Sequence, residues 1–428
     1  MAPEASDPDA QEGRPKTLVE RHGRALIEVA LASGFGILAS AGFQVVATRG
    51  LGPKEFGLLA AFLALINIAA IGSAALRNSV AVTIASAPAS ATTRIGRRID
   101  SSLIEALALG GIFAVGLIAA SPWLAGSLQS SPVALAVTAA TIVPYFLFAR
   151  GLGILQGRGR SRAVVWWSTG AQFVQLILAV LALALGYGAV GILVVFLVSV
   201  LVATIGSGYQ TRHLMSPVTT RPFEIDSMVV VALTIAFAWL TNVDVILVKA
   251  GAADLLAGSY AAAAVLVKTT LILPATLSLY LLPRFVGSRG NVALTRLGVR
   301  LTLLFTFLGG VVILAVLTLG GGLIVPLLYG PGYQLTISLL PWLCLMWLPW
   351  AMTQAILVRI TSISSKVGLA ILGGAMVAQW VGCNLVLPNI QAMIAVNTSI
   401  GVVSFVALFL VHHRHAQRIP EDVPTVED

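Results

Sequence analysis

The sequence predicts an all-α polytopic membrane protein with about 12 transmembrane helices in two six-helix pseudo-repeat bundles. Of its 428 residues, 58% are hydrophobic and only 10% are charged, whereas a soluble protein carries about 25% charged residues. Apolar runs long enough to cross a bilayer alternate with short breaks rich in glycine, proline or charge. The basic residues gather in every second break, which predicts that both termini lie in the cytoplasm.

A spanning helix needs about 20 mainly apolar residues, and the runs of this kind give twelve expected spans. They are residues 25–48, 55–86, 101–121, 133–156, 163–185, 188–211, 226–248, 255–283, 301–327, 334–358, 367–387 and 390–411. The second and eighth runs are too long for a straight span, so we expect each to bend or to continue beyond the bilayer.

Charge placement supports this topology. With the N-terminus inside, the cytoplasmic segments collect twenty of the 26 Lys and Arg residues, and the external breaks hold only Arg49, Lys54 and Lys249. This asymmetry is what the positive-inside rule requires. The formal net charge of +9 is therefore assigned to topology, and no nucleic-acid partner is expected.

The same segments define five regions. They are a cytoplasmic N-terminal tail (1–24), a first bundle (25–211), a cytoplasmic linker (212–225), a second bundle (226–411) and a cytoplasmic C-terminal tail (412–428). Each bundle holds six spans, so both enter the membrane from the same side, which predicts a parallel repeat about an axis along the membrane normal.

Two similar stretches, about 200 residues apart, mark the start of the repeat. "TRGLGPKEFG" begins at Thr48 and "LVKAGAADLLAGSY" begins at Leu247. In each, a span ends on a cation, a short external turn follows, and the next helix begins near a glycine, Gly57 or Gly258. In the first copy the glycines and Pro53 predict a tight turn that no helix runs through.

Thr48–Gly57 resembles the opening of the bacterial polysaccharide and O-antigen flippases, a family of the multidrug/oligosaccharidyl-lipid/polysaccharide exporter (MOP) superfamily. Four later segments are similar to segments at the same relative places in that family: "ARGLGILQGRGRSR" from Ala149, "VDVILVKAGAADLLAGSYAAA" from Val243, "LPATLSLYLLPR" ending at Arg284 and "PLLYGPGYQLTISLLPWL" from Pro326. The resemblance spans nearly the whole chain.

The resemblance implies a V-shaped pair of six-helix bundles that alternates access. Its implied substrate is an undecaprenyl-pyrophosphate-linked oligosaccharide, moved across the bacterial cytoplasmic (inner) membrane. The expected partners are this lipid-linked glycan, membrane lipids, and a glycan polymerase or glycosyltransferases of the same pathway. The protein is expected to be a monomer and a multi-pass protein of that membrane.

Cations inside the spans are the expected substrate-binding groups, because ionisable residues at that depth are costly and usually face a cavity or a partner. They are Lys268, Arg77 and Arg150. Lys268 lies about fourteen residues into the eighth span, near mid-membrane at about 1.5 Å per residue. Arginine adds a bidentate geometry for phosphate oxygens. The alternative is structural ion pairing of Arg77 or Arg150 with Glu28 or Glu105.

Asp244 lies near the outer end of the seventh span, close in depth to Arg49 and Lys249. Three roles stay open for it: a gate pair with Arg49 when the outer mouth closes, a proton site for coupling, or a fixed pair with Lys249. Glu28 and Glu105 are further candidates for gating or coupling.

Polar and aromatic residues within the spans are candidates for sugar contacts. The polar candidates are Asn67, Gln175 and Gln354. Five tryptophans fit either stacking on a glycan or the aromatic belts at the membrane interfaces, and the belts are the favoured assignment. They are Trp166, Trp167, Trp342, Trp347 and Trp350.

Two rival functions remain. A small-molecule or drug antiporter of the same superfamily would favour a cavity rich in acid, which the central cations argue against. A membrane glycosyltransferase, polymerase or ligase would need acidic or histidine groups on sizeable external loops, and here those loops are short and hold no histidine. No enzyme activity and no catalytic residue are therefore expected.

Neither a metal site nor a cofactor is expected. Cys344 and Cys383 sit in apolar runs without metal-ligand spacing, and the histidines fall in the tails and the central loop. Coupling to an H⁺ or Na⁺ gradient or to the membrane potential stays open.

Overall fold

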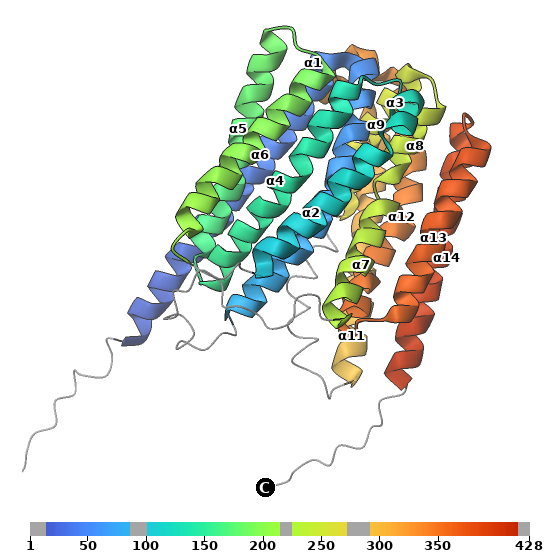
Figure 1. The fold of residues 1–428 in the computed structure, drawn as a ribbon. Coiled ribbons are helices and arrows are strands. Elements are labelled where there is room, and N and C mark those ends of the chain that lie inside the picture. Colours follow the sequence, from blue (N-terminus) through green and yellow to red (C-terminus); the bar gives the residue numbers. More distant parts are fainter. Residues whose placement is uncertain (1–13, 86–100, 215–224, 272–291, 418–428) are drawn as a thin grey trace, which may run out of the picture.

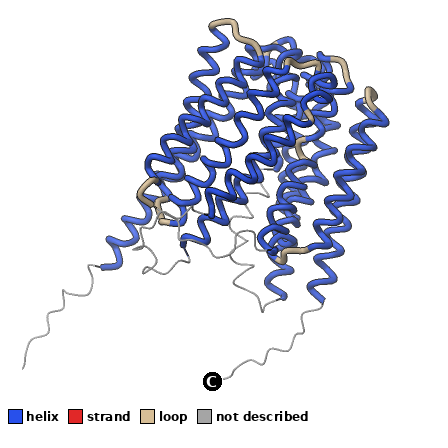
Figure 2. Tube along the Cα trace, in the orientation of Figure 1, coloured by secondary structure: helices blue, strands red, loops and turns tan. Residues whose placement is uncertain are grey.

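The computed structural model describes residues 14–85, 101–214, 225–271 and 292–417 (Figure 1). In these segments the chain forms helices joined by short turns, and no strand occurs (Figure 2). Five segments lie outside the described residues: the outer parts of the two tails, the break after the second span (86–100), most of the linker, and residues 272–291, which include the last part of the eighth span.

Most helix boundaries lie within a few residues of the predicted spans, but the first and ninth spans begin earlier than predicted and the seventh is divided into two helices. The α-helices are α1 (Arg14–Ala85), α2 (Ser101–Ala119), α3 (Ser121–Leu128), α4 (Pro132–Gly157), α5 (Ser161–Ala184), α6 (Ala189–Thr211), α7 (Ile225–Leu240), α8 (Val243–Gly251), α9 (Asp254–Val267), α11 (Val292–Tyr329), α12 (Gln334–Ser362), α13 (Lys366–Val386) and α14 (Ile390–Gln417). Two short 3₁₀ helices are η3 (Lys268–Leu271) and η4 (Pro331–Tyr333).

Ten of the described helical segments are long and apolar enough to cross a membrane. Many large apolar side chains point outward, such as Leu319, which is 86% exposed, and a bilayer is the solvent in which such a surface is stable. The chain is therefore a multi-pass membrane protein. The expected number was about 12, and two features account for the difference. The first two predicted spans fall in one segment, Leu31–Ala85, and the eighth is described only to Leu271.

Helix α1 doubles back at Gly52. This glycine has φ 69° and ψ 173°, and it is the residue at which α1 leaves helical geometry. An L-residue with a side chain rarely takes this conformation, and the following Pro53 lacks a backbone N–H. The predicted tight turn is thus confirmed, although it is narrower than expected because Gly50 stays helical.

The bend gives the bundle two recognisable ends. Helix α1 begins, and α14 finishes, at one end of the bundle, and α1 turns back at the other end (Figure 1). Gly52 is the residue at that turn. We call these the Glu28 end and the Gly52 end. Helices α1 to α6 form the first half of the described chain, and α7 to α14 form the second half.

Helix α1 joins the two halves. It packs against α4 and α5 of the first half and against α7, α8 and α9 of the second. Figure 1 shows α2, α4, α5 and α6 on one side and α7, α12, α13 and α14 on the other. The core between them contains large, almost fully buried side chains, among them Phe56, Phe62, Tyr260 and Trp347.

Candidate functional site

The two halves meet backbone to backbone at the Gly52 end. A Cβ atom built on Gly258 of α9 would lie 1.8 Å from the carbonyl oxygen of Pro53, and one built on Gly57 would lie 2.9 Å from the backbone nitrogen of Gly258. These distances are shorter than any real carbon contact. The glycines that the sequence placed at matching points of its repeat therefore touch each other, and only glycine at 258 allows this approach.

Side chains reinforce the contact between the halves. The Arg49 Nη2 atom donates to the carbonyl oxygen of Leu327 at 2.6 Å. The Tyr333 hydroxyl donates to the carbonyl oxygen of Thr48 at 2.8 Å and is buried. Arg49 thus joins the two halves, as the gate hypothesis required, but its partner is a backbone carbonyl.

An ion-pair cluster completes this end. The Asp254 carboxylate pairs with Lys249 of its own half and lies 3.6 Å from Lys54 of the first half. The hydrogen bond from Lys249 lowers the pKa of Asp254 below its ordinary value of 3.8, and the Coulombic attraction of Lys54 adds to this. The hypothesis of a fixed pair between Asp244 and Lys249 is wrong, because Asp254, just beyond the end of α8, takes the Lys249 ammonium.

A polar cavity of about 420 Å³ lies inside the first half, between α1, α4, α5 and α6. Arg77 is the charged residue of its lining. Its other polar members are hydroxyl and amide side chains: Ser40, Gln44, Asn67, Ser73, Tyr145, Ser168, Gln172, Gln175 and Ser199. The structure therefore brings Arg77, Asn67 and Gln175 together, and no carboxylate is among the described residues that line this cavity.

Arg77 is half-buried near the last turns of α1. Its Nε atom is buried without a hydrogen-bond partner among the described residues, and so is the Oε1 atom of Gln44. Leaving a buried donor unsatisfied costs about 1–3 kcal/mol, and more when the group is charged. Among the described residues, both groups are therefore available to a further hydrogen-bond partner.

A second pocket, of about 70 Å³, lies where the halves meet. Gln44 and Asn67 line both cavities, and Asn242 and Lys268 line only the smaller one. The two amides thus stand between the Arg77 cavity in the first half and Lys268 in the second.

Lys268 has a partner that the sequence analysis did not predict. Its Nζ atom lies 3.0 Å from Oδ1 of Asp244, a carboxylate that is fully buried. The Tyr260 hydroxyl donates to Oδ2 of the same carboxylate at 3.0 Å. The Lys268 ammonium also lies 4.7 Å from the centre of the Trp347 ring, within the range of a cation–π interaction. Asp244 is therefore engaged inside its own half.

This arrangement corrects the gate hypothesis. In the described conformation Asp244 binds Lys268 and Tyr260, and Arg49 binds Leu327, so no Arg49–Asp244 pair is formed. The positive charge of Lys268, which the sequence analysis assigned to substrate binding, is balanced by the Asp244 carboxylate. Trp347 and Trp350 are fully buried, so the interfacial-belt assignment is wrong for both.

The remaining predicted site residues lie apart from the cavity. Arg150 of α4 donates from Nε to the Ser102 hydroxyl at 2.9 Å and is not in the cavity lining, so the structure does not bring Arg150 and Arg77 together in this cavity. Glu28 pairs with Arg162 of α5 rather than with Arg77 or Arg150. Glu105 is half-buried on α2, and Gln354 lies on α12 outside both linings, with a buried Oε1 atom that has no described partner.

The sequence analysis did not assign Tyr260 or Tyr145 to a site, although the sequence contains a signal for each. Tyr260 and Lys268 are eight residues apart, so they lie on the same side of a helix and can reach one carboxylate. Tyr145 of α4 lines the Arg77 cavity and carries a hydroxyl group within a mainly apolar span. A search for such isolated polar groups would have found both tyrosines.

No protein-family model and no curated protein matches the sequence. Solved structures do match in fold. An inward-facing multidrug resistance MATE family transporter of the MOP superfamily has a TM-score of 0.68 at 16% identity, over 90% of this chain and 95% of the other. An outward-facing one has a TM-score of 0.53 at 15% identity, over 92% and 96%.

A third similar structure is a MOP superfamily transporter from Pyrococcus furiosus, whose binding pocket is described as having reverse polarity that suggests a different function. Its TM-score is 0.56 at 16% identity, over 92% of this chain and 96% of the other. All three similarities cover nearly the whole of both chains. The chain therefore has the fold of the MATE family transporters of the MOP superfamily.

Proposed function

We propose that this protein is an alternating-access exporter that moves an anionic, pyrophosphate-linked lipid oligosaccharide across a bacterial cytoplasmic membrane. The observation that carries the proposal is the polar cavity of the first half, which has Arg77 as its charged group and no carboxylate in its described lining. The finer identity of the lipid carrier, undecaprenyl, comes from the family resemblance in the sequence.

The charge of the cavity favours an anion. A guanidinium in a low-dielectric site needs a counter-charge, since an unpaired buried ion costs several kcal/mol. A diphosphate supplies that charge and can accept two parallel hydrogen bonds from one arginine. An organic cation would meet an uncompensated positive charge, so the cavity favours an anionic substrate over the cationic drug of the antiporter alternative, which shares the same fold.

The other lining groups suit a glycan. Amide and hydroxyl side chains form hydrogen bonds with sugar hydroxyls without adding charge. Asn67 and Gln175 lie in the same cavity as Arg77, and the unsatisfied Gln44 Oε1 atom is a free acceptor. A substrate with a diphosphate next to sugars would satisfy both kinds of group.

The closed Gly52 end supports alternating access. The positive-inside pattern places this end outside the cell, so the described state would be closed outward. The higher TM-score to an inward-facing structure, 0.68 against 0.53 for an outward-facing one, supports this interpretation. Export then requires the Gly258–Pro53 contact to open.

Transport by purified protein in liposomes tests the proposal. A fluorescent polyprenyl-diphosphate oligosaccharide is placed in one leaflet and its appearance in the other is followed. We expect Arg77→Ala to lower the rate by about tenfold or more, because it removes a charge-assisted bidentate contact, and Arg77→Lys to fall between. Arg212→Ala, which removes an exposed cation at the end of α6, is the matched control. A full rate with Arg77→Ala would refute the proposal.

A further inference from the structure

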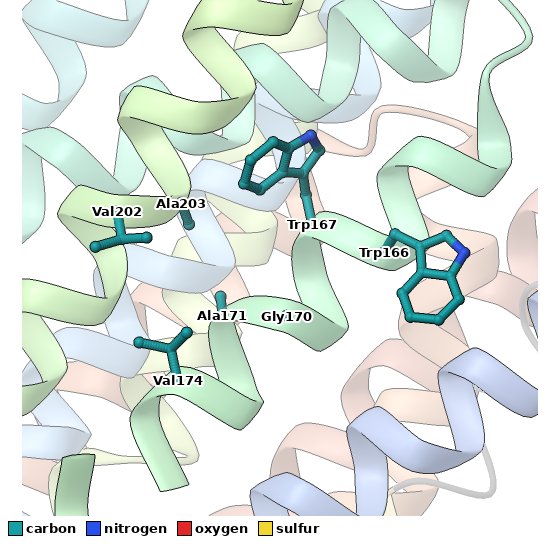
Figure 3. A pocket seen from close by; sticks show the side chains of 7 residues that line it. All are labelled: Trp166, Trp167, Gly170, Ala171, Val174, Val202 and Ala203. Atoms are coloured by element: carbon teal, nitrogen blue, oxygen red, sulfur yellow. The ribbon is translucent and has the colours of Figure 1, made fainter. Parts of the chain in front are cut away.

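An apolar groove of about 270 Å³ runs between α5 and α6 on the outer surface of the first half. Figure 3 shows its lining: Trp166, Trp167, Gly170, Ala171, Val174, Val202 and Ala203. Every one of these side chains is apolar or aromatic. Trp166 is 57% exposed and Val202 is 48% exposed, so the groove opens toward the surroundings of the helix bundle, which in a membrane are lipid chains.

The tryptophans at its mouth are held in place. The Trp167 ring covers Gly206 of α6, where an added Cβ would lie 2.0 Å from a ring carbon. The Trp167 Nε1 atom donates to Oε1 of Gln210 at 2.5 Å. Trp166 donates from Nε1 to Oε1 of Glu28 at 3.4 Å. The packing of Trp167 on Gly206 and the hydrogen bonds of the two tryptophans therefore define the shape of the groove at the Glu28 end.

The groove adjoins the polar cavity. Ala171 of α5 lines both of them. Ala203, at the floor of the groove, is buried in a cluster with Phe148 and Leu152, and these two residues line the cavity. The wall between the apolar groove and the Arg77 cavity is thus thin, and its α5 and α6 parts carry methyl side chains.

We propose that this groove holds the hydrocarbon chain of an anionic lipid whose phosphate head binds in the cavity at Arg77. A long prenyl chain loses hydrophobic free energy if it enters a polar cavity, whereas a groove open to the bilayer keeps the chain in an apolar medium throughout. The juxtaposition of an apolar slot and a cationic, carboxylate-free cavity matches the two parts of such a lipid. The inference rests on the proposed function for the direction of transport, and it adds where the lipid chain lies.

The groove lies at the Glu28 end of the bundle, which agrees with its assignment to a lipid chain. Glu28 and Arg162 form an ion pair beside the mouth, and the positive-inside pattern places this end in the cytoplasm. A lipid made on the cytoplasmic face would present its chain to the groove from that leaflet. Its head would then meet the cavity while the Gly52 end is closed.

Photo-crosslinking tests the inference directly. The full chain in liposomes is mixed with a polyprenyl diphosphate that carries a diazirine in its first isoprene units, irradiated, and mapped by mass spectrometry. We expect labels on the α5 and α6 residues of the groove, displaced by unlabelled polyprenyl diphosphate. Because the head contact involves charge, we expect labelling to fall about tenfold in Arg77→Ala and to be weak with an uncharged polyprenol probe.

A substitution that fills the groove provides a second test. Val202→Trp fills the groove from its exposed wall without altering the buried core, and Ile205→Trp, at a 70% exposed position of α6 outside the groove lining, is the matched control. We expect Val202→Trp to lose both labelling and lipid-oligosaccharide transport, and Ile205→Trp to retain both, with equal thermal stability of the two proteins.

The outcomes separate this inference from the proposed function. Normal transport by Val202→Trp, or labels confined to other helices, would overturn the groove assignment and leave the exporter in place. Groove labelling that depends on Arg77, in a protein that moves no lipid oligosaccharide, would keep the lipid site and remove the proposed function. Equal labelling by polyprenol, or crosslinks from the groove to a second protein chain, would also overturn the assignment.

Discussion

Gly258 of α9 touches the carbonyl group of Pro53 in α1 so closely that a Cβ atom at position 258 would lie 1.8 Å from that oxygen. This contact joins the two halves at the Gly52 end, and it leaves no room for a side chain. Any substitution at Gly258 must therefore push the halves apart or be absorbed by a backbone shift.

The first prediction is that Gly258→Ala opens the Gly52 end. Spin labels at Leu185 and Leu385, which are 65% and 79% exposed, report the separation of the halves by pulsed electron resonance. We expect a longer distance in Gly258→Ala than in the parent, because the added methyl group collides with backbone and not with a flexible side chain. The buried native cysteines, Cys344 and Cys383, stay unlabelled.

Gly126→Ala is the control for this prediction. Gly126 lies in α3, and a Cβ atom there would meet nothing within 4 Å, so the distance should not change. If Gly258→Ala gave the same distance as Gly126→Ala, the backbone contact would not be what holds this end closed.

The second prediction concerns pH. The hydrogen bond from Lys249 and the charge of Lys54 hold the pKa of Asp254 below its ordinary value of 3.8. A carboxylate with a depressed pKa contributes its stabilisation above the unfolded value and loses it as the pH falls through the folded value. Contact between Lys54 and Asp254 should therefore persist at neutral pH and weaken only below about pH 4.

The same pair of spin labels checks this expectation. In the parent protein the distance distribution should stay constant from neutral pH down to about pH 4 and shift to longer values below it. Asp254→Asn should show the longer component already at neutral pH and respond less to acid. A parent distribution that shifts between about pH 7 and pH 5 would assign the response to another group.

The third prediction concerns the buried pair of Lys268 and Asp244. Removal of one partner of a buried ion pair costs about 3–5 kcal/mol, since the other charge stays buried alone. We expect Lys268→Met and Asp244→Asn each to lower the thermal midpoint in detergent strongly, and the double variant to recover much of the loss. In the double variant the Tyr260 hydroxyl can still donate to the amide oxygen that the Asp244→Asn substitution introduces.

A second double-mutant cycle separates this pair from the gate hypothesis. Arg49 and Asp244 do not contact each other in the described state, so Arg49→Ala and Asp244→Asn should be additive within about 0.5 kcal/mol. A strong coupling between Arg49 and Asp244, with none between Lys268 and Asp244, would contradict the structure.

Much of the fold could be predicted from the sequence because bilayer thickness fixes helix length and breaks carry strong local signals. The break at Gly52 followed from glycine and proline chemistry. The end of α6 at Thr211 coincides with the end of the predicted span 188–211, because the polar residues that follow cannot continue an apolar span. These are local properties that need no knowledge of tertiary packing.

The pairing of charges could not be predicted in the same way. The depth of Asp244 was predicted by counting residues from the end of a span. In the structure, however, the helix is interrupted between Leu240 and Val243, and α9 ends just before Lys268. Counting along straight helices therefore predicted different depths for Asp244 and Lys268, whose side chains are in contact. Likewise, Arg150 and Arg77 are both cations within spans of the first half, yet Arg150 contacts Ser102 and Arg77 lines the cavity, because the direction in which a side chain leaves its helix depends on packing.

The central claim is that the Arg77 cavity selects an anionic substrate, and a comparison of substrate charge tests it most directly. One preparation of liposomes containing the protein is given three fluorescent polyprenyl oligosaccharides that differ only in their link, which is a diphosphate, a neutral ether or a quaternary amine. We predict that the diphosphate is moved at least about tenfold faster than the other two, and that Arg77→Ala removes this preference. Faster movement of the cationic compound, with a preference unchanged in Arg77→Ala, would contradict the account.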